Sequence, residues 1–360
     1  MRRMIIGRLS SSKSLSGAAC VPICVLVSVH FMMTLRTVLR ILCFLPLLCA
    51  ATAMAQPAGK PAPRIGLLLA GGLGANSPLT LALKEGLRPL GYSEAQRTVV
   101  FEVRNAEGHR ERLRPLAEEL VRAKVDLIFA GGDQAIAAAK EATGTIPIVM
   151  VACDAMSAGL ITNLARPGGN LTGVTCVNSD LAPKRLEILK EMFPKLARVG
   201  VLLNPDDRRM RAELAETEKA ALVLKIAVRP IRLAVLADFG PALAAAVAGR
   251  SEALVVAYDD LTIIHRQQLA GLAIAHRQPT IHNFREYVDA GGLISYGPSL
   301  AGMWRSAAGH VDKVLKGAKP GELPVEQPTR FELVINRKTE KALGVTIPRS
   351  LLARADVVIE

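Results

Sequence analysis

TIPIVMVACDAMSAGLITNLARPGGNLTG, residues 145–173, is the stretch that decides the fold of this 360-residue chain. It begins as a short apolar strand at residues 146–151, opens into a small polar turn at Cys153 and Asp154, and ends in a Pro-Gly-Gly-Asn turn before another apolar run. In open α/β sheets, ligands lie beyond the carboxyl ends of such strands. We therefore expect this stretch to form one lip of a cleft and then to carry the chain from one lobe to the next.

Short β-rich runs alternate with longer helical patterns on both sides of this stretch, which predicts an α/β fold with parallel sheets and crossover helices. Before it we expect strands at 64–70, 97–105 and 126–130 and helices at 77–91, 110–124 and 133–143. After Gly173 the alternation restarts. We expect helices at 183–193, 208–224, 239–248, 261–276 and 300–316, strands at 198–204, 225–233, 253–257, 279–283 and 291–297, and a last strand and helix within 329–344. The pattern predicts two doubly wound lobes.

The amino-terminal residues carry an export pattern. From Met33 a basic segment with Arg36 and Arg40 precedes an apolar run at 41–51 and the small residues Ala53-Met54-Ala55. This order predicts a signal peptide cleaved after Ala55 and a periplasmic protein. We interpret residues 1–32 as an extension upstream of the true start near Met33; the alternative is that the apolar run at residues 18–32 is a first hydrophobic segment.

Charge and cysteine content exclude several classes of protein. Residues 1–55 hold six of the 45 Lys and Arg and no acid, so the remainder has 39 basic and 32 acidic side chains. This modest excess is scattered and aromatics are few, which argues against nucleic-acid binding. Only Cys153 and Cys176 follow the leader, too few for a structural zinc site, and the histidines lack metal-ligand or catalytic spacing. We expect no metal, no cofactor and no catalysis, and favour two buried free thiols over a disulfide.

Acidic turns follow the predicted strands. They are Gly132-Asp133, Cys153-Asp154, Asp206-Asp207 and Tyr258-Asp259-Asp260. The acids of the two lobes would face each other across a cleft, where helix amino termini also point. The alternative is that Asp133, Asp207 and Asp260 only cap the helices that follow.

Arg285 is the candidate partner for a ligand carboxylate. It follows the strand that ends in His282-Asn283, and a guanidinium can bind a carboxylate with two hydrogen bonds. The alternative is a surface arginine on a short helix. Tyr258 and Tyr296 stand at strand ends, where they either stack on a ligand or close the edge of the core.

The loop AGGLGAN at residues 70–76 lies between a strand and a helix but carries only part of the dinucleotide fingerprint, because Ser77 stands where the third glycine belongs. An NAD-dependent oxidoreductase is therefore the alternative function. Tight NAD binding without a response to small solutes would favour it.

Several long motifs, in order, resemble the periplasmic substrate-binding proteins of ABC transporters, a family that includes tryptophan and other aromatic amino acid binders. They are GLRPLGY (86–92), LAEELVRAKVDLIFAGG (116–132), TIPIVMV (145–151), GLITNLARPGGNLTGVT (159–175), KRLEILKEMFPKLARVGVLLNP (184–205), REYVDAGGLISYG (285–297) and QPTRFELVINRKTEKALG (327–344). The resemblance covers the chain from about Arg64 to its end. It implies a type I periplasmic-binding fold whose two lobes are joined by a three-segment hinge and close on a small ligand.

By this resemblance, residues 64–173 and 291–322 form lobe I and residues 174–290 and 323–360 form lobe II, with hinges near Gly173, Gly291 and Pro324. The ligand-binding residues would be Leu73, Gly74, Gly132, Asp133, Cys153, Asp154, Tyr258, Asp259, Asn283, Arg285, Glu286 and Tyr296. The family usually has Gly-Asp-Pro where Cys153-Asp154-Ala155 stands, and often Thr-Pro where Gly132-Asp133 stands.

The extra acid Asp133 weakens the transfer of aromatic amino acid specificity and favours a ligand that bears an amine. We expect a monomer that binds an amino acid or related zwitterion. Arg285 would face the ligand carboxylate, and Asp133, Asp154 or Asp259 its ammonium. The expected partners are an ABC permease and its ATPase subunit, and a membrane receptor that senses the ligand is the alternative partner.

Overall fold

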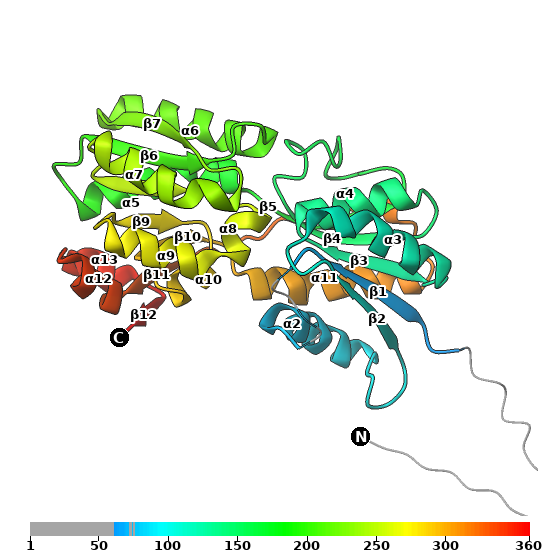
Figure 1. Ribbon diagram of the computed structural model, residues 1–360. Coiled ribbons are helices and arrows are strands. Elements are labelled where there is room, and N and C mark those ends of the chain that lie inside the picture. Colours follow the sequence, from blue (N-terminus) through cyan, green and yellow to red (C-terminus); the bar gives the residue numbers. More distant parts are fainter. Residues whose placement is uncertain (1–60, 72–73, 75) are drawn as a thin grey trace, which may run out of the picture. The chain divides into compact units, whose positions relative to one another are not determined.

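The computed structural model describes residues 61–360 apart from residues 72, 73 and 75, and two separate sheets organise this part of the chain (Figure 1). The predicted signal peptide, the start near Met33 and the candidate ligand residue Leu73 lie outside the described residues. None of the described helices is both long and apolar enough to span a membrane.

The first sheet has five strands in the order β2-β1-β3-β4-β5, and every pair is parallel. The strands are β1 (Arg64–Leu69), β2 (Val100–Asn105), β3 (Leu127–Gly131), β4 (Ile148–Cys153) and β5 (Leu171–Cys176). On one face Leu67 and Leu69 pack with α2 (Pro78–Leu87) and α11 (Leu300–Leu315). On the other face Leu68 packs with α3 (Leu113–Arg122) and α4 (Asp133–Ala142). We call this sheet with its helices lobe I.

The second sheet has seven strands in the order β12-β11-β10-β9-β8-β6-β7. The strands are β6 (Arg198–Leu203), β7 (Ala227–Arg232), β8 (Ala253–Val256), β9 (Thr280–His282), β10 (Ile294–Gly297), β11 (Glu332–Asn336) and β12 (Val357–Ile359). Only the β10–β11 pair is antiparallel. Its helices are α5 (Asn178–Met192), α6 (Arg208–Leu224), α7 (Phe239–Ala248), α8 (Asp260–Ile264), α9 (Arg266–Ala275), α10 (Arg285–Asp289), α12 (Arg337–Leu343) and α13 (Arg349–Arg354). We call this sheet with its helices lobe II.

The first five strands of each lobe follow the same order, in which the second strand lies outside the first and the third to fifth follow on the other side. The predicted α/β class with two doubly wound lobes is confirmed. Most expected elements are present, and 208–224 and 239–248 are found as predicted. The helix expected at 261–276 is two helices, α8 and α9, with His265 between them. The elements α13 and β12 were not predicted.

The chain passes between the two sheets three times. The passages lie at Val177 between β5 and α5, at residues 298–299 between β10 and α11, and at residues 327–331 before β11. The expected crossings at Gly173, Gly291 and Pro324 lie a few residues too early, and residues 325–326 still bond to lobe I. Gly173 is inside β5, which pairs along its whole length with β4, and β10 pairs with β9 and β11 of the second sheet. Strand β10 thus belongs to lobe II, whereas the sequence placed residues 291–297 in lobe I.

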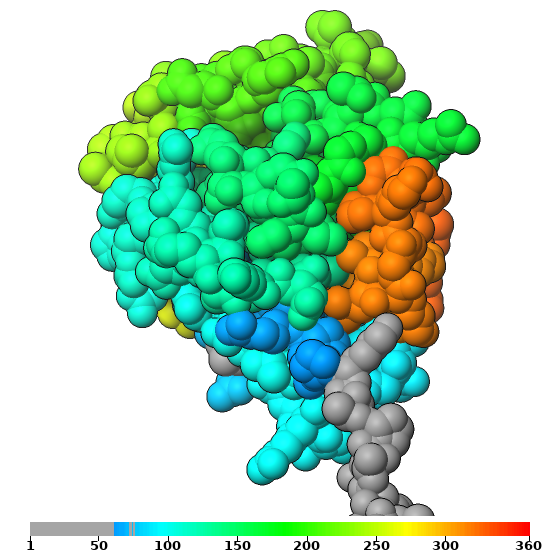
Figure 2. Space-filling model, turned by 90° about the vertical axis from the view of Figure 1, so that its right-hand side faces the viewer, coloured from blue at the N-terminus to red at the C-terminus, as the bar shows by residue number. Residues whose placement is uncertain are grey.

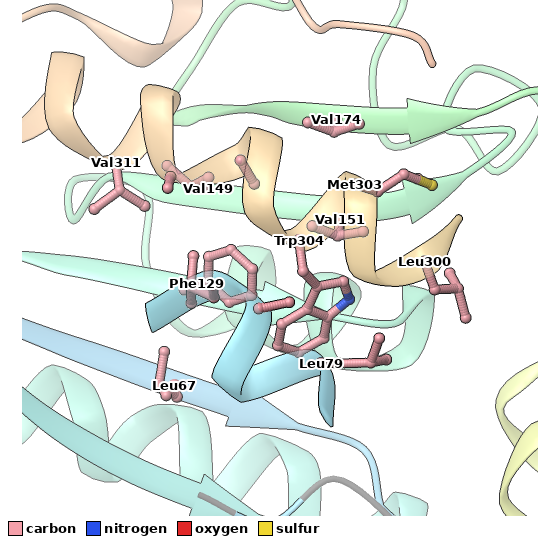
Figure 3. Packing of buried hydrophobic residues seen from close by; sticks show 14 of the residues in the cluster. Leu67, Leu79, Phe129, Val149, Val151, Val174, Leu300, Met303, Trp304 and Val311 are labelled. Atoms are coloured by element: carbon pink, nitrogen blue, oxygen red, sulfur yellow. The ribbon is translucent and has the colours of Figure 1, made fainter. Parts of the chain in front are cut away.

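Trp304, the single tryptophan of the chain, is the centre of the lobe I core near the cleft (Figure 3). It packs against Phe129 of β3 with ring centroids 4.9 Å apart and is 2% exposed. It belongs to α11, which comes more than 120 residues after β5 and returns to lobe I to cover α2. Figure 2 shows these late residues, coloured orange, against the cyan and green residues of the first lobe. The second passage therefore delivers part of the lobe I core.

Candidate functional site

A cavity of about 110 Å³ lies where the carboxyl ends of both sheets meet. Lobe I lines it with the ends of β1, β3 and β4 and with α2 and α11, and lobe II with α8, α9, α10 and Tyr258. Its apolar lining includes Leu79, Ile263, Ile264, Leu300 and Trp304, and its charged lining residues are Asp260, Arg266 and Glu286. The parallel topology explains the position, because helices that follow parallel strands start at the same edge of each sheet. The cavity suits a small, largely apolar ligand with a polar end.

Two glycines, Gly131 at the end of β3 and Gly132 before α4, allow close contacts with the lobe I core and with lobe II. A Cβ on Gly131 would lie 2.4 Å from Trp304, so only glycine leaves room for the indole. Gly132 has φ +92°, and a Cβ there would lie 2.7 Å from the Asp260 carboxylate of lobe II. The predicted ligand turn at Gly132 thus lines the cavity and lies against the opposite lobe.

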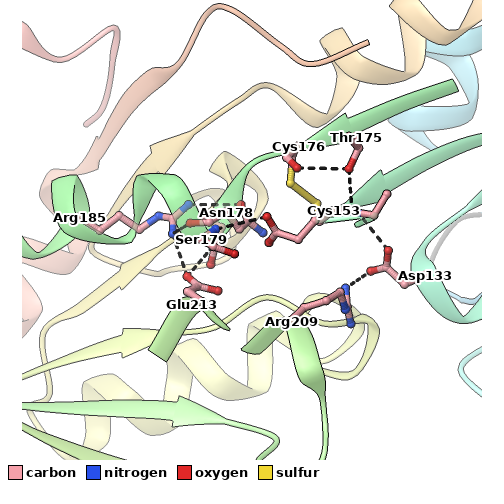
Figure 4. Close-up of a disulfide and its surroundings, with 12 residues drawn as sticks. Asp133, Cys153, Thr175, Cys176, Asn178, Ser179, Arg185, Arg209 and Glu213 are labelled. Carbon is pink, nitrogen blue, oxygen red and sulfur yellow. Dashed lines mark hydrogen bonds and ion pairs between the residues drawn. A yellow bond between two sulfur atoms is a disulfide. The ribbon is translucent and has the colours of Figure 1, made fainter. Parts of the chain in front are cut away.

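Asp133 and Arg209 form a buried ion pair between the lobes (Figure 4). Asp133 begins α4, and its other oxygen accepts a hydrogen bond from the Cys153 amide at 3.2 Å. Arg209 lies in the first turn of α6, where Asp207 caps the helix and also binds the guanidinium. Burial lowers the pKa of Arg209, but Asp133 and Asp207 outweigh it and raise that pKa above its ordinary value. Arg209 therefore stays charged, and its partner in lobe I is Asp133.

Some of the acids that follow the strands cap helices, and others face the cleft between the lobes. Asp207 and Asp259 accept hydrogen bonds from the backbone at the starts of α6 and α8, so the capping alternative holds for Asp207 and describes Asp259 too. Asp260 caps no helix of its own lobe. Its carboxylate instead accepts a hydrogen bond from the Gln134 amide of α4 at 3.4 Å. Burial and the nearby Asp133 raise the pKa of Asp260 to about 7. Asp133 and Asp260 thus face each other across the cleft with Arg209 beside them.

Cys153 and Cys176 form a disulfide, so the expectation of two free thiols is wrong. The parallel register of β4 and β5 places the two residues directly opposite each other, with Cα atoms 4.5 Å apart. The bond joins the end of β4, which lines the cavity, to the end of β5, from which the chain crosses to lobe II.

Asp154 follows the disulfide in a left-handed conformation, with φ +50°. Its carboxylate accepts a hydrogen bond from the Ser179 amide, just after the first passage, at 3.4 Å, and Asp154 does not line the apolar cavity. It lines a second groove beside that passage, together with Val177, Ser179 and Gln327. Burial and the nearby Glu213 raise the pKa of Asp154 to about 7.

A fully buried arginine, Arg185, hydrogen-bonds to the two lobe II segments that adjoin the first and second passages. It donates to the Asn178 carbonyl after β5 at 3.0 Å, to the Tyr296 carbonyl in β10 at 2.9 Å, and to the Glu213 carboxylate at 2.8 Å. Asn283 donates to the same Glu213 oxygen at 3.0 Å. Asn283 and Tyr296, both predicted to bind ligand, therefore belong to this network and do not line the cavity.

Arg285, the predicted partner of the ligand carboxylate, does not line the cavity. Its Nε atom pairs with Asp289 one turn later on the exposed side of α10, 3.1 Å away. Its neighbour Glu286 does line the cavity, as predicted, and Arg266 is the arginine found there. Tyr258 lines the cavity and packs edge-on against Phe284, with ring centroids 4.8 Å apart.

Gly74 precedes α2, where its carbonyl accepts hydrogen bonds from Ser77 and Thr80; it does not line the cavity. Gly71, by contrast, lines it, and a Cβ there would lie 2.3 Å from the Gly108 amide. Close packing of two loops explains this glycine without a phosphate.

Sequence reasoning missed Arg209, Arg266 and Trp304. Each had a signal: Arg209 lies two residues after a predicted helix cap, Arg266 lies in the first turns of a helix predicted to start at a strand end, and Trp304 is unique in the chain. Over the described residues, no group of three or more His, Cys, Asp or Glu side chains is placed to hold a metal ion.

Two α/β lobes with mainly parallel sheets, three passages of the chain between them and a cavity at the facing strand ends define a type I periplasmic-binding fold. The chain belongs to the ABC transporter substrate binding protein family, whose sequence pattern matches residues 79–359.

Known proteins are similar to the chain over most of its length. A tyrosine-binding protein of Clostridioides difficile is 27% identical over 262 residues, which is 72% of this chain and 75% of that protein. A crystal structure from Streptococcus pneumoniae, described as an ABC domain in complex with L-Trp, is 25% identical with a TM-score of 0.76 and covers 82% of this chain and 99% of that one. A conserved domain protein from Vibrio cholerae is 26% identical with a TM-score of 0.77 over the same shares.

Proposed function

We propose that this protein is the exported substrate-binding subunit of an ABC importer. It captures an amino acid or a related zwitterion in the cavity between its lobes, catalyses no reaction, and delivers the solute as a periplasmic monomer to a permease and its ATPase subunit. The observation that carries the proposal is the cavity itself, since both lobes line it and the Asp133–Arg209 pair holds them together beside it. Family membership and the tyrosine and tryptophan of the relatives support the same ligand class.

Capture proceeds by hinge closure. The three passages at 177, 298–299 and 327–331 are the hinge segments, and the proposed lobes are residues 64–176 with 300–326, and 178–297 with 332–360. A ligand that touches both lobes favours the closed form only by its extra affinity for that form. A change from mostly open to mostly closed takes about 5.5 kcal/mol of such differential binding.

A thermal-shift screen of the chain from Gln56 onward tests this function. The screen covers the twenty L-amino acids, short peptides, sugars and NAD. A ligand present at 100 times its dissociation constant stabilises the folded state by about 2.7 kcal/mol, which raises the melting temperature by several degrees. We expect at least one amino acid to do so and NAD to have no effect. A response to NAD or to sugars alone would contradict the proposal.

A further inference from the structure

The charged residues in and near the cavity differ in whether other protein groups already pair with them. Asp260 accepts the Gln134 amide and lies beside Gly132 in the group that includes Arg209, so its carboxylate has partners in the other lobe. Asp133 is likewise engaged by Arg209 and the Cys153 amide. The acids predicted to meet a ligand ammonium were Asp133, Asp154 and Asp259, and Asp154 and Asp259 also accept backbone hydrogen bonds, from Ser179 and Thr262. All three acids therefore already have protein partners, as does Asp260.

Glu286 and Arg266 differ from these acids. The Oε2 atom of Glu286 is buried and has no hydrogen-bond partner among the described residues. Arg266 donates Nη1 to the Ile263 carbonyl at 2.7 Å, and no carboxylate of residues 61–360, as far as they are described, lies within ion-pairing distance of its guanidinium. A buried carboxylate oxygen without a partner is costly, so a ligand that supplies a donor there gains affinity. Burial also raises the pKa of Glu286 to about 7, as expected for a carboxylate that lacks a counter-charge in direct contact.

These two side chains and the apolar wall share one cavity. Arg266 from the start of α9 and Glu286 from α10 are on lobe II, whereas Leu79, Leu300 and Trp304 are on lobe I. A guanidinium matches a carboxylate with two donors, and a carboxylate matches an ammonium. The cavity therefore offers both charges of an amino acid head group on one lobe and an apolar surface for its side chain on the other.

We propose that Arg266 binds the carboxylate and Glu286 the ammonium of a free amino acid, so that lobe II recognises the head group and the apolar lobe I wall recognises the side chain. This assignment rests on the proposed function and replaces Arg285, whose guanidinium pairs with Asp289 outside the cavity. It predicts selectivity for free amino acids over peptides and over derivatives that lack either charge.

The test is calorimetric titration of the chain from Gln56 onward with L-tryptophan, tryptamine and N-acetyl-L-tryptophan. If another amino acid binds in the melting screen, its own amine and N-acetyl derivatives replace this series. We expect each derivative to bind the parent protein at least about 30-fold more weakly than the amino acid, since each leaves one buried charge unpaired.

Arg266→Gln and Glu286→Gln should each weaken L-tryptophan by a similar factor. Arg266→Gln should leave tryptamine nearly unchanged, and Glu286→Gln should leave N-acetyl-L-tryptophan nearly unchanged. Arg266→Lys should restore part of the affinity. The matched controls are Arg305→Gln and Glu85→Gln, an exposed arginine–glutamate pair on lobe I, and neither should change any of the constants. Circular dichroism melts verify that each variant is folded.

The outcomes separate the two proposals. If no amino acid binds the parent protein, the proposed function fails and this assignment fails with it. If an amino acid binds and both glutamine variants bind it as tightly as the parent, only the assignment is overturned. A loss of affinity in Arg285→Gln in place of Arg266→Gln would also overturn it.

Discussion

Replacement of Arg209 by methionine should open the cleft and not unfold the protein. The change removes one partner of a buried ion pair and leaves Asp133 without a counter-charge. Loss of one partner of such a pair typically costs about 3–5 kcal/mol. Asp133 and Arg209 lie on different lobes, so separation of the lobes returns Asp133 to water and removes the penalty. The cost therefore falls on the closed form alone.

The lower figure, about 3 kcal/mol, corresponds to roughly a 150-fold shift of the closing equilibrium toward the open form. Ligand affinity should fall by up to that factor, because binding must then drive closure without the ion pair. The assay is titration calorimetry with the amino acid found in the melting screen, together with small-angle scattering of the ligand-free variant. We expect a larger radius of gyration than in the parent.

Two further variants control this experiment. Arg211→Met changes an exposed arginine of the same helix, which contacts only the Pro205 carbonyl, and should behave as the parent. Adding Asp133→Asn to Arg209→Met should recover most of the affinity, because the unpaired charge is gone while the side-chain oxygen still accepts from Cys153. An Arg209→Met protein with parental affinity and an unchanged radius of gyration would refute the reasoning.

Three other predictions follow from the same contacts. Burial and Glu213 raise the pKa of Asp154 to about 7 in the folded state, so the contribution of Asp154 to stability is greatest below about pH 4 and is lost as the pH rises toward 7. Asp154→Asn, which cannot ionise, should therefore raise the free energy of unfolding by a few kcal/mol at pH 8, as measured by urea unfolding, whereas Asp206→Asn on the surface should not. Gly131→Ala should displace Trp304 and lower the melting temperature and ligand affinity together, and a variant with both values intact would contradict the packing described. Glu286 must be ionised to bind an ammonium, so affinity should rise about 30-fold from pH 5.5 to pH 8 and then level off, and Glu286→Gln should flatten this profile.

The predicted pH dependence of ligand affinity depends on every charge near Glu286. Burial raises its pKa most, Glu332 of β11 and Asp289 of α10 raise it further, and Arg266 of α9 lowers it. Asp260 of the same cavity also has a pKa of about 7, which is why the glutamine variant is the decisive comparison. If Glu286→Gln keeps the parental pH dependence, the titrating group is another one.

The sequence predicted the fold well because its signals are local. Alternating strand and helix patterns, glycines after helices and caps such as Asp207 are readable without knowledge of the partners. The passages between the lobes were predicted a few residues too early, because a local signal such as a glycine does not show whether the strand continues through it. Gly173 reads as a breaker, but it lies inside β5, where its φ of +139° and its closeness to Met150 require glycine.

The site was predicted less well because it depends on direction and register. Arg285 and Glu286 are neighbours on a short helix, and about 100° separates successive side chains, so only one of them can face the cavity. The sequence indicated both and could not choose. The pairing of Cys153 with Cys176 likewise follows only from the register of β4 against β5. Arg209 and Asp133 are 76 residues apart, and nothing local in either helix shows that they meet.

The distance between the lobes, measured with and without ligand, tests the central claim most directly. Arg110 of lobe I and Val235 of lobe II line one groove at the mouth of the cleft, so Arg110→Cys and Val235→Cys provide sites for two spin labels. Pulsed electron resonance should show a broad distribution at longer distances in the ligand-free protein and a narrow, shorter distance when the amino acid is bound. An amino acid that binds tightly without any change in this distribution would contradict capture by closure of the two lobes.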